Sequence, residues 1–186
     1  MKKLSRKLGM LVLAAMMSGT ALLATPKDAD AQSPWWFYVD GGYSILTGDF
    51  SNAYKGGFTT NVAFGKILAE RFALGLFGGV GFHSLDVSVS GAPSLNVWRY
   101  GLWGGVNALE PANVWDVWFG AGVGLGTLAG GGGSDTNFLL QGNLAVSRQV
   151  SPTIALGING TFYIIFTEGS SWTGIPLTAF IEILTP

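Results

Sequence analysis

The sequence predicts an all-β fold, an eight-stranded antiparallel up-and-down transmembrane β-barrel. Of the 186 residues, 48% are hydrophobic and only 11% are charged, whereas soluble domains carry about 25% charged residues. Apolar residues alternate with glycine or polar residues along most of the chain, as strands between lipid and a lumen require. After residue 31, no stretch of roughly 18 to 20 residues is apolar enough for a transmembrane helix, which leaves strands to cross a membrane.

The first 31 residues have the three parts of a secretory signal peptide. A basic stretch at 1–7 precedes an apolar run at 8–24, and Ala29 and Ala31 place small side chains at the positions that a signal peptidase reads. We therefore expect a cleaved leader at 1–31 and one outer-membrane β-barrel domain at 32–186.

Charge and residue usage exclude several function classes. The leader carries five of the ten Lys and Arg and two of the eleven Asp and Glu, so the remaining chain has a formal charge of −4. Such a chain has no basic surface for a nucleic acid. With no cysteine and one histidine, a disulfide, a thiolate ligand and a cysteine nucleophile are excluded, and a transition-metal site is not expected. We expect no cofactor.

The first four strands are expected at 35–40, 58–68, 72–84 and 95–109. In the third, one face carries Phe72, Leu74, Leu76, Gly78, Val80 and Phe82, and the other carries Ala73, Gly75, Phe77, Gly79, Gly81 and His83. We assign the first face to lipid and the second to the lumen. In the fourth, Arg99 falls on the glycine-rich lumen face.

The last four strands are expected at 116–126, 137–150, 153–166 and 174–184. The fifth sets Val117, Phe119, Ala121, Val123 and Leu125 against Gly120, Gly122, Gly124 and Gly126. Glycines on the lumen face would make room for large side chains from neighbouring strands. The strands have about the 9 to 11 residues that a tilted strand needs to cross a bilayer.

The glycine-rich stretch also matches the spacing of a dinucleotide-binding loop, through Gly124, Gly126 and Ala129. That loop must lead into a helix whose N-terminus holds the phosphate. Here residues 130–133 are all glycine, and each glycine disfavours a helix by about 1 kcal/mol. We therefore interpret 130–135 as the tip of an external loop.

The expected connections alternate in length. Short turns fall at 68–71, 109–113 and 151–152, and longer loops at 44–57, 85–94, 129–135 and 167–173. Outer-membrane barrels have short turns on the periplasmic side and longer loops outside.

Two short motifs carry a resemblance to a known family. Residues 37–44 (FYVDGGYS) with 47–50 (TGDF) look like a first strand and loop, and residues 70–74 (ERFAL) look like a first periplasmic turn. On these residues the chain resembles the small eight-stranded outer-membrane β-barrel family, which includes the OmpA-type transmembrane domain. The resemblance implies insertion into the Gram-negative outer membrane by the outer-membrane assembly machinery. We expect a monomer in contact with the lipid bilayer, with loops available to lipopolysaccharide.

Polar residues on the lumen parity form the main candidate cluster. The interior of an eight-stranded barrel is just wide enough for side chains, so charges there must be paired. We expect an ion-pair network around Arg99 that plugs the lumen; the alternative is a narrow, gated ion channel built from the same groups. The cluster comprises Asp40, Arg99, Asp116, Gln141, Asn143, Asn159 and Glu182.

Four aromatic residues near predicted strand ends, Trp35, Phe72, Trp115 and Phe166, fall on the outward parity. This placement is typical of the aromatic girdles at membrane interfaces. Strands are in any case enriched in aromatic residues.

His83, Ser84 and Asp86 are the one grouping that suggests nucleophilic catalysis. Neighbouring residues in a strand point to opposite faces, so His83 and Ser84 should not meet. We therefore expect no catalytic or metal-binding residues and predict a structural, envelope-integrity role with loops available for surface contacts. The alternatives are a lipid-modifying enzyme on the same barrel and a soluble periplasmic ligand-binding barrel.

Overall fold

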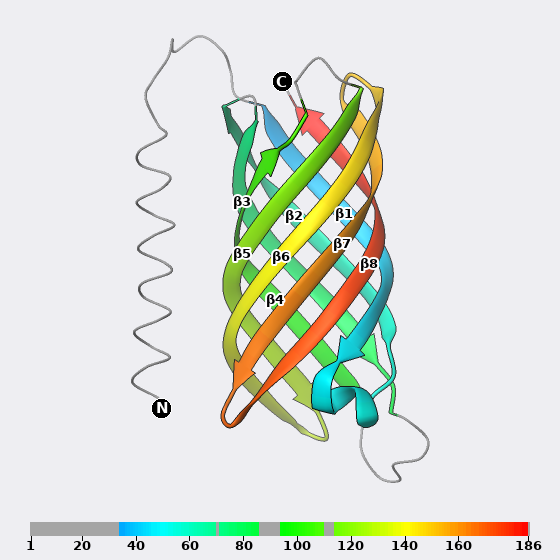
Figure 1. The fold of residues 1–186 in the computed structure, drawn as a ribbon, viewed down its shortest axis with the longest axis vertical. Coiled ribbons are helices and arrows are strands. Elements are labelled where there is room, and N and C mark those ends of the chain that lie inside the picture. The colour runs from blue at the N-terminus through cyan, green and yellow to red at the C-terminus, as the bar shows by residue number, and fades with distance from the viewer. Residues whose placement is uncertain (1–33, 70, 86–93, 110–113, 186) are drawn as a thin grey trace. The chain divides into compact units, whose positions relative to one another are not determined.

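The computed structural model describes residues 34–69, 71–85, 94–109 and 114–185, which form a closed barrel of eight antiparallel strands (Figure 1). This confirms the predicted fold class. The strands are β1 Trp35–Thr47, β2 Gly57–Ala69, β3 Phe72–His83, β4 Leu95–Asn107, β5 Trp115–Gly130, β6 Gly133–Ser151, β7 Ile154–Thr167 and β8 Ser170–Thr185, with a 3-10 helix, η1, at Gly48–Asn52. The expected leader lies outside the described residues. Within the described ranges, no helix has the length and apolar character needed to cross a membrane.

The barrel closes between its first and last strands. β1 and β8 pair from Trp35 opposite Thr185 to Thr47 opposite Thr173. We call the end where β1 begins and β8 ends the terminal end, and the opposite end, where η1 lies, the loop end (Figure 1). Closure leaves no sheet edge, so backbone groups along the wall can be paired from strand to strand.

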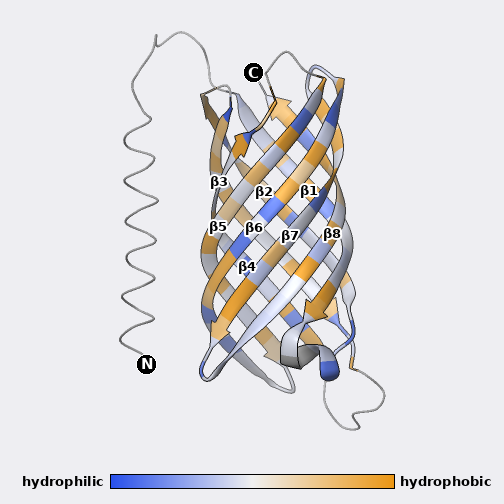
Figure 2. Cartoon of the chain, in the orientation of Figure 1, coloured by the Kyte–Doolittle hydropathy of each residue, from blue (hydrophilic) through white to orange (hydrophobic). Residues whose placement is uncertain are grey.

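Side chains alternate between the two faces of the wall as predicted. In β7, Ile158 is 67% exposed and the next residue, Asn159, is 8% exposed. In β1, Trp35 and Phe37 face outward while Trp36 and Asp40 are buried. Figure 2 shows this alternation as bands of apolar and polar colour along the strands. The outer face of the barrel is therefore apolar over most of its height.

Strands β1, β5 and β6 are clearly longer than expected, with 13, 16 and 19 residues. Two of the predicted longer loops, 129–135 and 167–173, are instead two-residue turns between continuous strands. Gly131 and Gly132 have φ of 61° and 83°, as a type I′ hairpin turn requires at its two central positions. The prediction was wrong there because a run of glycine and polar residues resembles a loop, whereas left-handed glycines let the strands pair up to Gly130 and Gly133.

Candidate functional site

The barrel interior has three layers, of which two are packed side chains and the third is a cavity. The first layer, at the loop end, is an apolar cluster with members that are 0% to 9% exposed. Leu139 and Ile165 are both 0% exposed and are partners across the β6–β7 ladder. The cluster consists of Leu95, Val97, Leu128, Leu139, Tyr163, Ile165 and Trp172. It covers the lumen with packed hydrocarbon and aromatic groups.

The second layer is a polar network centred on Asp40. The Asp40 carboxylate accepts hydrogen bonds from the backbone N of Asn61 at 2.9 Å, from Asn61 Nδ2 at 2.6 Å and from Thr178 Oγ1 at 2.9 Å. The Tyr38 hydroxyl donates to it as well. Four donors thus replace the water that this carboxylate loses on burial, and each hydrogen bond to a charged group contributes about 1.5 to 3 kcal/mol.

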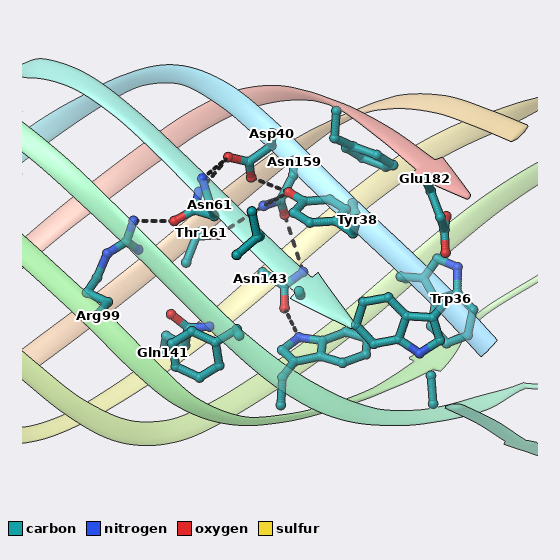
Figure 3. A pocket seen from close by; sticks show the side chains of 18 residues that line it. Trp36, Tyr38, Asp40, Asn61, Arg99, Gln141, Asn143, Asn159, Thr161 and Glu182 are labelled. Atoms are coloured by element: carbon teal, nitrogen blue, oxygen red, sulfur yellow. Dashed lines mark hydrogen bonds between the residues drawn. The ribbon is translucent and has the colours of Figure 1, made fainter. Parts of the chain in front are cut away.

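Hydrogen bonds continue from Asp40 around the barrel. Asn159 Nδ2 donates to Tyr38 Oη at 3.0 Å, Asn143 Nδ2 donates to Asn159 Oδ1 at 3.2 Å, and Trp103 Nε1 donates to Asn143 Oδ1 at 2.7 Å. This path runs through β1, β7 and β6 to β4. On the other side, Asn61 on β2 accepts from Arg99, which also lies on β4. The path therefore begins and ends on β4, so that the hydrogen bonds together with this strand form a ring across the lumen (Figure 3).

Arg99 is held by neutral partners. Its Nη2 donates to Asn61 Oδ1 at 2.7 Å and to Thr59 Oγ1 at 3.3 Å, and its guanidinium lies 4.6 Å from the ring centroid of Tyr163. Among the described residues, no carboxylate accepts a hydrogen bond from Arg99. The expected ion pair is thus replaced by an amide bridge. The side chain of Asn61 lies between Asp40 and Arg99 and hydrogen-bonds both of them.

The remaining members of the predicted cluster lie apart from this ring. Asp116 Oδ1 accepts a hydrogen bond from Asn107 Nδ2, near the terminal end. Gln141 and Glu182 line a cavity beside the ring. The structure therefore brings Asp40, Arg99, Asn143 and Asn159 into one connected network and places Asp116, Gln141 and Glu182 outside it.

β3 and β5 contribute no side chain to the ring, and each has a glycine at the level of the ring. A Cβ at Gly79 of β3 would collide with Asn61 Oδ1. A Cβ at Gly120 of β5 would collide with Asn143 Oδ1 and Trp103 Nε1. Glycines of the lumen face therefore provide the space in which the amides and the indole meet, as the sequence predicted for this face.

The third layer is a cavity of about 90 Å³, which borders the polar network and extends from it towards the terminal end. Aromatic rings form much of its wall. Trp36 and Trp103 meet edge to face with centroids 5.3 Å apart, Trp103 and Trp118 are 6.3 Å apart, and Tyr38 and Phe180 are 4.8 Å apart. Within the described residues, no group of three or more His, Cys, Asp or Glu is placed to hold a metal ion.

The four predicted interface aromatics all point outward near strand ends. Trp35, Phe72, Trp115 and Phe166 are 53%, 41%, 46% and 43% exposed. Trp35, Phe72 and Trp115 begin β1, β3 and β5, and Phe166 is next to last in β7. Lys66 lies 5.8 Å from the Trp35 ring and Arg148 lies 5.7 Å from the Trp115 ring. Basic and aromatic side chains thus occur together at the terminal end, as they do at membrane interfaces.

His83 and Ser84 do not form a catalytic pair. His83 is 2% exposed, inside the barrel, with Nδ1 3.3 Å from the carbonyl oxygen of Lys55. Ser84 follows the end of β3 and is exposed. Asp86, the third member of that grouping, lies outside the described residues. A buried histidine beneath the loop end cannot meet a lipid substrate on the outer face.

Sequence reasoning did not include Asn61, Tyr38, Thr59 and Thr178 in the polar cluster. All four lie at inward positions of their strands, which the alternation of the sequence indicates. A polar side chain that faces so narrow a lumen needs a hydrogen-bond partner inside it. Their mutual contacts depend on strand register, which the alternation does not give.

No family model matches the sequence, and no curated protein matches it. Solved structures do resemble its fold. Neisserial surface protein A superposes with a TM-score of 0.67 at 13% identity, over 80% of this chain and 96% of that chain. The outer membrane protein OprG from Pseudomonas aeruginosa gives 0.57 at 11% identity, over 84% and 96%. The N-terminal β-barrel domain of Pseudomonas aeruginosa OprF gives 0.55 at 11% identity, over 83% and 98%.

At sequence identities this low, the structural similarity shows a shared fold and does not show a shared activity. The shared features are the closed eight-stranded antiparallel wall and its near-complete coverage of each compared chain. The chain therefore has the fold of the small eight-stranded outer-membrane β-barrels.

Proposed function

We propose that this chain is a monomeric, integral protein of the Gram-negative outer membrane with a structural role in the envelope and a lumen that does not conduct ions. The observation that carries the proposal is the filled interior. An apolar cluster and a hydrogen-bonded polar network lie one behind the other along the barrel axis. An ion on this path would have to displace both packed side chains and buried hydrogen bonds.

The outer surface supports a membrane location. Trp98, Tyr100 and Leu102, successive outward residues of β4, are 48%, 44% and 50% exposed. Large apolar side chains are exposed in the same way on all eight strands, far beyond the apolar patch that a soluble monomer tolerates. A soluble periplasmic barrel is therefore disfavoured, because this face would be in water.

Conductance in planar lipid bilayers tests the closed lumen. We expect the purified barrel to give no stable conductance. The double variant Leu139→Ala with Ile165→Ala opens the apolar cluster and should raise ion flux. The matched control is Leu140→Ala with Ile164→Ala, the adjacent pair on the opposite face of the same ladder, which should leave the lumen closed. A steady channel in the unmodified protein, lost in Arg99→Ala, would favour the ion channel instead.

Location can be tested separately from conductance. The leader expected at 1–31 would direct export, and the outer-membrane assembly machinery would insert the barrel. We expect the protein in the detergent-extracted outer-membrane fraction, migrating differently in detergent gels before and after heating because the barrel resists detergent. Recovery in the periplasmic supernatant without detergent would overturn the proposed location.

The loop end supplies the surface for external contacts. The β5–β6 hairpin there carries exposed Ser134, Asp135 and Thr136. We propose that these elements, together with η1, are available to lipopolysaccharide, a ligand or a host surface. We propose no catalytic role, because His83 lies inside the barrel and apart from the lipid-facing side.

A further inference from the structure

The cavity at the terminal end of the lumen has an acidic group that the polar network does not use. Glu182 of β8 lines the cavity beside Tyr38, its partner on β1. Among the described residues it has no hydrogen-bond or ion-pair partner. Its neighbour Asp40, by contrast, is saturated by four donors.

The charges around the cavity do not balance. Asp40, Glu182 and Arg99 line it, and Asp116 lies nearby at the same end. Among the described residues that line the cavity, Arg99 is the one with a cationic side chain, and it is already held by Asn61, Thr59 and the Tyr163 ring. Figure 3 shows Arg99 and Glu182 at opposite sides of the cavity. While it is ionised, a carboxylate in this half-enclosed space is stabilised by a cation beside it.

The walls of the cavity favour a particular kind of cation. Three indole rings and the rings of Tyr38, Phe77 and Phe180 line it. Aromatic faces attract cations through the ring quadrupole, and aromatic cages are the usual receptors of alkylated ammonium groups. Magnesium and calcium need several oxygen ligands in a defined geometry, which one carboxylate among indoles does not offer.

The dimensions restrict the cation to a small one. An apolar cavity of about 150 Å³ takes a benzene molecule, and this cavity has a volume of about 90 Å³. Glu182 and Trp118 are only partly buried, so a ligand can reach the space from the terminal end. At the loop end the apolar cluster closes the lumen.

We propose that this cavity is a binding site for a small alkylammonium cation, with the ammonium centre held between the Glu182 carboxylate and the indole rings of Trp36, Trp103 and Trp118. The ligand enters and leaves this site at the terminal end, and its binding does not require a conducting lumen.

The test uses the full mature barrel in detergent micelles, with dimethylammonium chloride as the probe and calorimetry together with tryptophan fluorescence as readouts. Sodium chloride at the same ionic strength controls for charge screening, and ethanol serves as a neutral probe of similar size. We expect saturable binding of dimethylammonium only. Saturation by ethanol to the same degree, or by sodium, overturns the proposal, because the site would then not select an alkylammonium cation.

Variants locate the site. Glu182→Gln keeps the shape of the side chain and should weaken binding about tenfold, as should Trp118→Leu. The matched controls are Asp135→Asn, an exposed acid of the β5–β6 hairpin, and Trp115→Leu, which alters an outward tryptophan of the same strand; both should bind as the unmodified chain does. Heat-modifiable migration verifies that each variant is folded. Unchanged affinity in folded Glu182→Gln, or no saturable binding by the unmodified barrel, overturns the proposal.

Discussion

Asn61 holds Asp40 through two donors on one oxygen: its backbone N lies 2.9 Å and its Nδ2 2.6 Å from Asp40 Oδ1. Its own Oδ1 accepts from Arg99 Nη2 at 2.7 Å. One neutral residue thus satisfies the anion with its backbone and side-chain nitrogens and the cation with its side-chain oxygen. Asp40 and Arg99 are therefore coupled without touching, and the bridge closes the ring across the lumen.

The first prediction concerns this bridge. Asn61→Leu keeps the approximate side-chain size but removes one donor to Asp40 and the acceptor of Arg99, leaving both charges short of a partner inside the barrel. We expect the free energy of unfolding to fall by about 3 kcal/mol or more, the range found when a buried charge pair loses one partner. Urea titration of the barrel folded in lipid vesicles measures it.

Asn137→Leu is the control for that substitution. The Asn137 side chain also hydrogen-bonds a carboxylate, that of Asp135 at 2.7 Å, but this contact is exposed near the loop end. Surface substitutions of this kind change stability by about 0.5 kcal/mol. Equal losses in the two variants would mean that the amide bridge contributes nothing specific to the barrel.

The second prediction concerns the space that glycine provides. Gly120→Ala places a methyl group where Trp103 Nε1 meets Asn143 Oδ1, so the indole or the amide must move. We expect a loss of about 1 to 3 kcal/mol in the free energy of unfolding, as for other overpacked sites. A shift of the indole NH resonance of Trp103 in NMR spectra should accompany it. Gly122→Trp, which must displace Gln141 and Phe77, should prevent folding.

Gly142→Ala provides the comparison for Gly120→Ala. Gly142 is on the neighbouring strand, and an added Cβ would meet only the carbonyl oxygen of Gly120, at 3.8 Å. Without a clash, the substitution should be neutral or stabilise the barrel by about 0.4 to 1 kcal/mol through a less flexible unfolded chain. If Gly120→Ala is tolerated as well as Gly142→Ala, the ring does not pack as described.

How far the sequence predicts this molecule depends on the range of the interactions. Alternation is local, so the position of the strands and the faces of Trp35, Trp36 and Asp40 follow directly from period two. The contact of Asn159 with Tyr38 joins residues 121 positions apart. It depends on the register of β7, β8 and β1 around the closed wall, which no local pattern specifies.

The same distinction explains where the structure differs from the prediction. The charges on the inner face predict an ion pair at Arg99, whereas the register places the amide of Asn61 nearest to the guanidinium. Glycine and polar residues gather at 129–135 and 167–173 and predict loops there. In a hairpin, Gly131 and Gly132 take positive φ, and the polar residues extend the strands beyond the apolar part of the wall.

The third prediction tests for lipid chemistry. His83 is 2% exposed and its Nδ1 lies by the Lys55 carbonyl, so it has no access to lipid A or phospholipid on the outer face. Mass spectrometry of lipids from cells with the unmodified chain, with His83→Ala, and without the chain should give one lipid profile. Any product that requires His83 would overturn the structural role and favour the lipid-modifying enzyme.

The fourth prediction tests which end of the barrel faces the outside. A short epitope inserted between Gly131 and Gly132 should be tolerated, because these residues form the tip of a hairpin and a Cβ at Gly132 would meet nothing within 4 Å. An insertion between Pro152 and Thr153 lies in the turn at the other end. Antibody should bind the first variant on intact cells and the second only after the outer membrane is permeabilised. The reverse pattern would place the loop end in the periplasm, and the terminal cavity would then open to the cell surface.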